Sequence, residues 1–249
     1  MDIKLYEDER IDQLYAQDVK IIQSSSVFSF SLDAVLLANF VKPSFKNNKK
    51  ALDLCAGNGA VGLFISKIFK GKIDEVEIQN RLADMALRSV KLNDLENKIT
   101  VYNEDLNSID SILKKDSYDI VTCNPPYFKA SSNSKKNPNK YLAIARHEIA
   151  VTLEQVISVS SGMLKTGGKL YLVHRPDRLL EILETMKNNR LAPKRIKLVH
   201  PKREREANMV LIEAIKDGKI DGMKFLAPIF IYNKDEYTDE VKEMLYGRK

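Results

Sequence analysis

The sequence predicts an α/β fold with a mostly parallel sheet of seven strands, an antiparallel last strand and helices on both faces. Three observations support this prediction. Short apolar segments alternate with helix-like segments between residues 50 and 188, as in successive β-α-β units. A turn with three spaced glycines follows the first of these strands. The last two apolar segments are joined by a short charged turn, which favours an antiparallel pair.

Each strand is expected where a short apolar run ends at a polar or glycine position. The predicted strands are 50–55, 72–78, 99–103, 118–123, 169–174, 195–199 and 208–214. The predicted helices between them are 59–69, 80–92, 106–113, 152–164 and 176–188. An earlier helix begins near Asp33 and stops before Pro43, after an irregular start with short β-like pieces. The segment from about Gly218 to the end receives no assignment.

The composition limits the class of protein. The 249 residues, 44% of them hydrophobic, suffice for one large domain. No apolar run is long enough for a membrane span, and the acidic start does not resemble a secretory signal. The two cysteines do not suggest a disulfide framework, so we expect a cytosolic protein. The net charge of +6 gathers in the stretches 129–146 and 194–205. Such stretches suit a phosphate backbone, although solvated loops explain them equally well.

The turn after the first strand has the spacing of a nucleotide-binding loop. Gly57 allows a tight turn, Gly59 a close approach of the backbone to a ligand, and Gly62 close packing of helix on sheet. Such a glycine pattern is weak evidence alone, because ordinary turns also contain glycines. Here it follows a strand and opens a helix, which is the context that a nucleotide-binding loop requires.

Acidic residues follow the next two strands. Glu77 ends the second strand, where a carboxylate can accept hydrogen bonds from both hydroxyls of a ribose. Glu75 is a competitor, but the alternation with Val76 and Ile78 favours Glu77; a solvent-facing acid is the plain alternative. Asp105 follows the third strand and can contact an adenine amine, or only cap the next helix.

The fourth strand ends in Asn124-Pro125-Pro126-Tyr127. The two prolines make a rigid turn that leaves the carbonyl oxygen of Pro125 free to accept a hydrogen bond beside the side-chain oxygen of Asn124. Two such acceptors can hold the hydrogens of a planar amine, and Tyr127 offers a ring for stacking a base. They concentrate the nitrogen lone pair and stabilise the positive charge that develops when a methyl group arrives. An ordinary turn after a strand is the alternative reading.

Over residues 20–215, these motifs resemble those of the class I methyltransferases that depend on S-adenosylmethionine (SAM) and carry an NPPY motif. Proteins of this class have a Rossmann-like fold. The segments 30–38, 76–79, 124–128 and 145–148 are similar to the bacterial tRNA adenine-N6 methyltransferases, which modify the adenosine 3′ of the anticodon in a valine tRNA. The resemblance implies SAM as cofactor, and tRNA as substrate. It also implies that residues 1–45 cap the cofactor site and that residues 46–249 form one methyltransferase domain.

The resemblance and the strand-end rule together define the expected site. The catalytic residues are Asn124, Pro125, Pro126 and Tyr127. The cofactor-binding residues are Asp33, Asp53, Cys55, Gly57, Asn58, Gly59, Glu77, Ile78, Asp105 and Asn124, with Asp53 similar to the family's acid that faces the methionine amino group. The substrate-binding residues are Tyr127, Phe128, Lys129, Lys135, Lys136, Lys140 and Arg146.

Other candidates carry plainer explanations. Phe128 lines a base pocket or only caps the core, and His147 is more typical of a structural residue than of a catalytic one. Cys55 and Cys123 suit buried, small hydrophobic positions. The aromatic residues Tyr6, Tyr15, Phe28 and Phe30 suit packing better than a platform for bases. We see no clustered histidine or cysteine ligands, so no metal is expected, and we expect a monomer.

Three other functions compete. A glutamine-N5 methyltransferase that acts on a protein release factor shares the NPPY chemistry but usually carries an N-terminal helical domain, for which about 30 residues leave no room. A DNA adenine methyltransferase needs a domain that recognises its target, and none is evident. A non-catalytic scaffold that binds SAM and RNA would not need Asn124 and Tyr127. These contrasts favour methylation of adenine in RNA.

Overall fold

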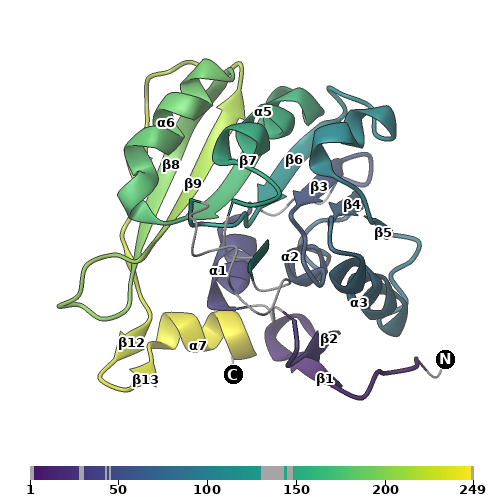
Figure 1. Cartoon of the computed structure of the whole chain (residues 1–249). Coiled ribbons are helices and arrows are strands. Elements are labelled where there is room, and N and C mark those ends of the chain that lie inside the picture. The colour runs from purple at the N-terminus through teal and green to yellow at the C-terminus, as the bar shows by residue number, and fades with distance from the viewer. Residues whose placement is uncertain are drawn as a thin grey trace.

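The computed structural model describes residues 3–27, 31–42, 44, 46–129, 143–144 and 148–247. A central mixed sheet runs through the molecule, with helices on both of its faces (Figure 1). Its strands are β3 (Lys50–Leu54), β4 (Lys72–Val76), β5 (Ile99–Tyr102), β6 (Tyr118–Cys123), β7 (Leu164–His174), β8 (Leu191–His200) and β9 (Met209–Lys216), with the two-residue β10 (Lys224–Phe225) and β11 (Ile229–Phe230). The seven longer strands are the seven that the sequence predicts.

The strand order is β10-β8-β9-β7-β6-β3-β4-β5, and β11 also pairs with β8. Strands β3 to β7 are parallel, whereas β9 runs antiparallel to both β7 and β8. The prediction of a mostly parallel sheet with an antiparallel last strand is therefore confirmed. The chain first builds outward from β3 to β5 and then returns to β6 on the other side of β3. A ligand site is expected at this reversal, at the carboxyl ends of β3 and β6.

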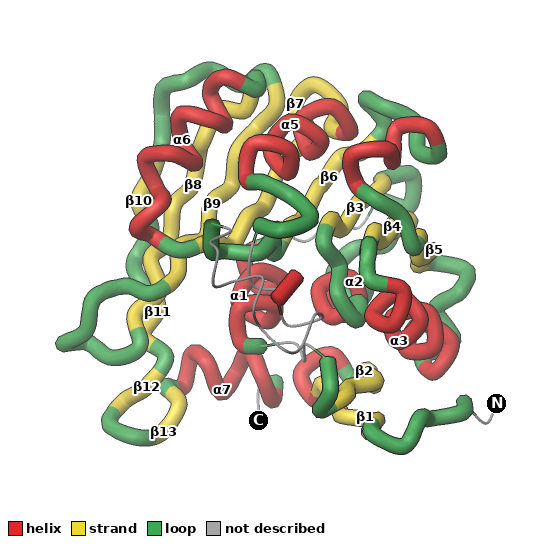
Figure 2. The backbone as a smooth tube through the Cα atoms, viewed as in Figure 1, coloured by secondary structure: helices red, strands yellow, loops and turns green. Residues whose placement is uncertain are grey.

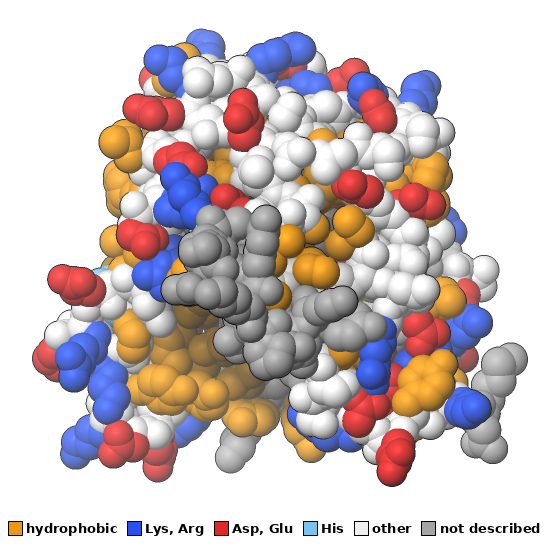
Figure 3. Space-filling view, in the orientation of Figure 1, with side chains coloured by type: hydrophobic (Ala, Val, Ile, Leu, Met, Phe, Trp, Pro, Cys, Tyr) orange, Lys and Arg blue, Asp and Glu red, His pale blue; other side chains and the backbone are white. Residues whose placement is uncertain are grey.

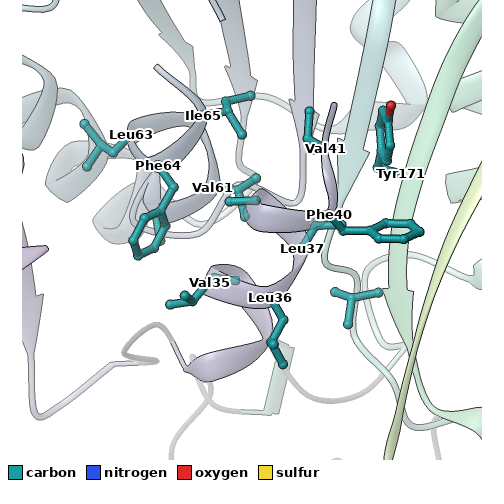
Figure 4. Close-up of a cluster of buried hydrophobic side chains, with 14 of the residues drawn as sticks. Val35, Leu36, Leu37, Phe40, Val41, Val61, Leu63, Phe64, Ile65 and Tyr171 are labelled. Atoms are coloured by element: carbon teal, nitrogen blue, oxygen red, sulfur yellow. The ribbon is translucent and has the colours of Figure 1, made fainter. Parts of the chain in front are cut away.

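One face of the sheet is covered by α1 (Leu32–Phe40), α2 (Ala60–Ile65) and α7 (Asp239–Tyr246). Figure 4 shows how the side chains of α1 and α2 meet, with Val35, Phe64 and Val61 among them and Tyr171 of β7 nearby. Helix α1 is mostly apolar, and most of its side chains are buried, because it lies between the sheet and α7.

The opposite face is covered by α5 (Leu153–Met163), α6 (Leu179–Asn188) and the short 3-10 helix η2 (Leu106–Ser111). Helix α3 (Asn80–Leu92) packs on β5 and on the first hairpin, which consists of β1 (Glu9–Leu14) and β2 (Val19–Ser24). Two arginines of α3 attach this hairpin. Arg88 forms an ion pair with Glu9 at 2.7 Å, and Arg81 forms one with Asp8 at 2.5 Å.

Several predicted boundaries were wrong. Residues 1–30 were expected to be irregular, with short β-like pieces near Val19–Ile22 and Val27–Phe30. Strand β2 confirms the first piece, whereas β1 and the regular antiparallel hairpin were not predicted, and residues 28–30 lie outside the described residues. Helix α2 is shorter than its predicted range of 59–69, and β7 begins at Leu164 instead of residue 169. The tail after residue 218 contains β10, β11, the small hairpin of β12 (Tyr232–Asn233) and β13 (Glu236–Tyr237), and α7. Figure 2 shows this tail running from the edge of the sheet to α7, near the β1–β2 hairpin.

Candidate active site

A pocket opens at the carboxyl ends of the parallel strands, where the chain order reverses. The loops after β3, β4, β5 and β6 line it, together with Ala34 of α1 and Ile144. Most of the residues predicted to bind cofactor meet there. They are Cys55, Gly57, Asn58, Glu77, Ile78, Asp105 and Asn124. In Figure 3, apolar side chains gather at the middle of this face, beside the atoms that are not described.

The turn after β3 is shaped by backbone torsions that only a few residue types tolerate. Cys55, Gly57 and Gly59 have φ angles of 57°, 58° and 82°. This turn brings the backbone N–H of Gly57 to 2.8 Å from Oε2 of Glu77, while the N–H of Gln79 lies 2.8 Å from Oε1. Burial raises the pKa of Glu77, and these N–H donors oppose that shift. The backbone thus fixes the Glu77 carboxylate at the pocket wall.

Glu75, on sequence grounds a weaker candidate than Glu77 for the ribose-binding acid, is fully buried beneath the same turn. A Cβ atom at Gly62 would lie 1.8 Å from Oε1 of Glu75, and one at Gly59 would lie 2.9 Å from Oε2. These two glycines therefore leave room for a carboxyl group, and Gly59 does not itself line the pocket. Within the part of the chain that the structure describes, neither oxygen of Glu75 has a hydrogen-bond partner. Burial and the neighbouring Asp53 raise the pKa of Glu75 well above 4.5, which favours its uncharged form.

Asp53 lies beside Glu75 on the paired strand β3 and is also buried. Its Oδ1 accepts a hydrogen bond of 2.6 Å from the hydroxyl of Thr122, and its Oδ2 has no partner among the described residues. Burial raises the pKa of Asp53 to about 7, and the nearby Glu77 contributes to the shift. The Oδ2 atom of Asp53, which lacks a hydrogen-bond partner among the described residues, is suited to interact with a cationic group of a ligand.

The remaining residues of this wall have separate partners. Asp105 caps η2, because its Oδ1 accepts hydrogen bonds from the backbone and side chain of Asn107, and it also lines the pocket. The side-chain amide of Asn58 donates to the carbonyl oxygen of Ile22 at 3.0 Å, which joins the glycine turn to β2. Ile78 exposes 43% of its surface at the pocket, where it offers an apolar contact to a flat ring.

The loop after β6 places Asn124 and Pro126 in the same pocket. Both prolines are buried, and Asn124 is half-buried. The hydroxyl of Tyr127 lies 2.6 Å from Oδ1 of Asn124 and 2.7 Å from Oδ2 of Asp33 in α1. Burial and the adjacent Asp33 raise the pKa of Tyr127 well above 10, so the phenol keeps its proton. Asp33 therefore contacts the loop after β6, and Asp33, Asp53 and Tyr127 do not line the pocket.

Two residues around this loop, His174 and Arg178, were missed from the sequence. The ring of His174, at the end of β7, lies 5.3 Å from the ring of Tyr127, and burial lowers the pKa of His174 to about 4. Arg178 donates to the carbonyl oxygen of Tyr127 at 3.3 Å and pairs with Glu148 at 2.6 Å. His174 and Arg178 follow a fifth parallel strand, so the strand-end rule extended to β7 would have found them.

The predicted substrate-binding residues are only partly described. Phe128 is 42% exposed, with the guanidinium of Arg175 lying 5.1 Å above its ring. The ammonium of Lys129 lies 3.1 Å from Glu181. The other predicted residues lie outside the described residues, as do three more that the sequence singled out. These are Lys135, Lys136, Lys140 and Arg146, and then Phe28, Phe30 and His147.

The described parts of the chain contain no helix long and apolar enough to cross a membrane. Over the same residues, no three potential ligands among histidine, cysteine, aspartate and glutamate converge on one point.

Comparison with known proteins relates the chain to methyltransferases. Residues 18–190 match the family model of the methyltransferase small domain. A solved structure described as a predicted O-methyltransferase from Agrobacterium tumefaciens superimposes with a TM-score of 0.67. It is 26% identical in sequence, and the superposition covers 87% of this chain and 96% of that one.

Two curated relatives differ in how much of each protein is matched. A tRNA1(Val) (adenine(37)-N6)-methyltransferase from Porphyromonas gingivalis is 26% identical over 223 residues, which cover 87% of this chain and 86% of the relative. A release factor glutamine methyltransferase from Clostridium acetobutylicum is 29% identical over 153 residues, which cover 57% of this chain and 52% of the relative.

Proposed function

The chain belongs to the methyltransferase small domain family, and we propose that it transfers a methyl group from SAM to the N6 amine of an adenosine in a tRNA anticodon loop. One observation carries the proposal. The Asn124–Tyr127 loop enters the same pocket as Glu77, so an amine-binding loop and a ribose-binding acid share one site. The pocket therefore has one wall for a nucleoside cofactor and another for a planar amine.

The residues of the chain suit each part of the cofactor. Glu77 accepts hydrogen bonds from the ribose, because the backbone N–H groups of Gly57 and Gln79 hold its carboxylate at the pocket wall. Asp105 and Ile78 contact the adenine of the cofactor. Asp53 is buried and does not itself line the pocket, but its Oδ2 has no partner among the described residues, so the methionine amino group bound nearby would stabilise the ionised form of Asp53.

At the acceptor, Asn124 and the carbonyl oxygen of Pro125 hold the two hydrogens of the amine. SAM supplies the methyl group on a positively charged sulfonium, which needs no acid to activate it. The two oxygens concentrate the nitrogen lone pair and stabilise the charge that develops on nitrogen. The chain also aligns the amine with the methyl group, which converts a bimolecular encounter into a positioned reaction.

The extent of the sequence matches favours adenine over glutamine as the substrate. The adenine-N6 relatives include one matched over 86% of its length, whereas the glutamine-methylating relative is matched over 52%. Phe128, exposed beside Arg175, adds a flat apolar surface and a cation next to the amine-binding loop. A base and its phosphate need these two features, whereas a glutamine side chain needs neither.

Further proposals concern the surroundings of the site. The exposed Lys129 and the basic residues up to Arg146 contact RNA phosphates. Residues 1–45 cap the cofactor site, and residues 46–249 form the catalytic domain. The enzyme acts as a monomer in the cytoplasm and without a metal ion.

The decisive test measures transfer of labelled methyl from SAM to total tRNA, duplex DNA and a release-factor protein in parallel. The modified unit is then identified by mass after digestion. We expect N6-methyladenosine in tRNA and no label in any acceptor with the variant Asn124→Ala. Label in protein glutamine or in DNA would retain the cofactor and overturn the substrate.

A further inference from the structure

The hydroxyl of Tyr127 lies within hydrogen-bonding distance of two oxygen positions, at 2.7 Å from Oδ2 of Asp33 and 2.6 Å from Oδ1 of Asn124. A phenol carries one proton and can donate it to only one of them. One of the two neighbours must therefore be a donor to the Tyr127 oxygen. The identity of that donor determines which way the Asn124 amide faces.

Asp33 has the contacts of a carboxylate. Its Oδ1 accepts hydrogen bonds from the backbone N–H of Ala34, at 3.0 Å, and from the hydroxyl of Ser31. Its Oδ2 faces Tyr127, so every one of these contacts presents a donor to Asp33. Asp33 also lies in the first turn of α1, where the helix dipole favours a negative charge. The proton of Tyr127 therefore points to Asp33.

The orientation of Asn124 follows from this. The Tyr127 oxygen, having given its proton to Asp33, can only accept from Asn124. The oxygen and nitrogen of an amide occupy nearly the same positions after a half-turn of the group. The amide NH2 of Asn124 therefore faces Tyr127, and its oxygen is left as a free acceptor on a side chain that lines the pocket.

We propose that Asp33 is a positioning residue, which acts through the Tyr127 hydroxyl to hold the Asn124 amide with its oxygen available to the amine that is methylated. This proposal rests on the proposed transfer of a methyl group to an amine or amide nitrogen. Without Asp33, the Tyr127 proton turns to the Asn124 oxygen and occupies the acceptor that the reaction needs. The ring of His174 packs against that of Tyr127 and limits its movement.

The arrangement predicts an unusual rescue. Asp33→Ala leaves the Tyr127 hydroxyl free to bind the Asn124 oxygen, and we expect kcat to fall about 50-fold. Tyr127→Phe removes both the hydroxyl and its proton, so Asn124 is unheld but its oxygen is not blocked, and we expect a loss of about tenfold. In the double variant no hydroxyl remains to bind and block the Asn124 oxygen. Its kcat should therefore recover to the level of Tyr127→Phe alone.

The test measures kcat of methyl transfer by these variants at saturating SAM and saturating acceptor, using the acceptor that wild-type enzyme methylates. Affinity for S-adenosylhomocysteine, measured by calorimetry, and thermal unfolding accompany each rate. Recovery of kcat in the double variant, with unchanged affinity, establishes the proposal. A double variant slower than both single variants would overturn it and leave Asp33 a structural cap of α1. Weaker S-adenosylhomocysteine binding by Asp33→Ala without rescue would overturn it in favour of direct cofactor contact.

The outcome is separate from the identity of the substrate. If wild-type enzyme methylates protein glutamine instead of adenosine, the proposed function fails, while the same variants still decide the role of Asp33 on that acceptor.

Discussion

The pocket at the carboxyl ends of the parallel strands has a cofactor half and an acceptor half, and the two are stabilised in different ways. In the cofactor half, the loops after β3, β4 and β5, backbone N–H groups of Gly57 and Gln79 fix the carboxylate of Glu77. In the acceptor half, the loop after β6, side chains fix one another, and the Asp33–Tyr127 contact joins segments 94 residues apart. Short local segments therefore shape the cofactor half, whereas a contact distant in sequence shapes the acceptor half. Substitutions in the cofactor half should therefore change cofactor affinity, and substitutions in the acceptor half should change the rate of methyl transfer.

The largest effect should come from breaking the acceptor half alone. Asn124→Ala removes one of two amine acceptors, and we expect kcat to fall by at least about 100-fold. Affinity for S-adenosylhomocysteine, followed by calorimetry, should stay within about twofold. Asn233→Ala, an exposed amide in β12, is the matched control and should change neither quantity. Wild-type turnover by Asn124→Ala would remove this residue from the reaction.

The next effect tests the packing beneath the cofactor half. Gly62→Ala places a methyl group against the buried Glu75 carboxyl, and we expect a loss of about 1–3 kcal/mol in the free energy of unfolding by urea. Gly162→Ala in α5 is the control, since no atom outside its local backbone lies within 4 Å of the added Cβ. Adding Glu75→Ala to Gly62→Ala should restore part of the loss. If Gly62→Ala were as stable as the parent, the steric role of Glu75 would be wrong.

A smaller effect should come from breaking the cofactor half alone. Glu77→Ala removes the ribose acceptor, and we expect binding of SAM to weaken about tenfold, or about 1.4 kcal/mol. The rate at saturating SAM should change little, in contrast to Asn124→Ala. Glu154→Ala, an exposed acid on α5, serves as the control. Unchanged affinity in calorimetry would exclude Glu77 from the site.

The smallest effect concerns pH. The pKa of Glu75 is raised well above its ordinary value in the folded state, whereas the unfolded chain releases this proton above about pH 4.5. The folded state therefore binds more protons and loses stability as the pH rises above this value. Asp53, whose pKa is about 7, adds a similar loss that is complete near pH 7. Glu75→Gln cannot ionise, so its Tm relative to the parent should rise as the pH is raised from about 5 to about 8. A constant difference would mean that Glu75 does not titrate in this range.

Much of the cofactor half could be predicted because its signals are local. Three spaced glycines after a strand, and an acid at the end of the next strand, identified the turn and Glu77 from short stretches of sequence. The same strand-end reasoning located Asn124. Glu75 was weighed only as a competitor, since a carboxyl group with no partner in the core is not expected from its sequence context.

The parts that could not be predicted depend on distant contacts or weak patterns. Strand β1 has the sequence ERIDQL, whose charges hide the alternation of a strand, and its register is set by pairing with β2 and α3. The predicted strand 169–174 missed the first residues of β7, because this part is irregular: the pairing with β6 shifts register between Leu164 and Lys169, and pairing with β9 begins only at Lys169. No local pattern could reveal that Asp33 binds Tyr127.

The two cysteines at the strand ends provide a chemical reporter of the site. Cys55 is half-buried and lines the pocket, whereas Cys123 is buried, with its pKa raised well above 9. A small thiol-alkylating reagent should therefore modify Cys55 and spare Cys123. Bound cofactor would cover Cys55, so the rate at which this thiol is alkylated would report the fraction of empty cofactor sites. The affinity of the cofactor site for a ligand could then be measured without any methyl acceptor.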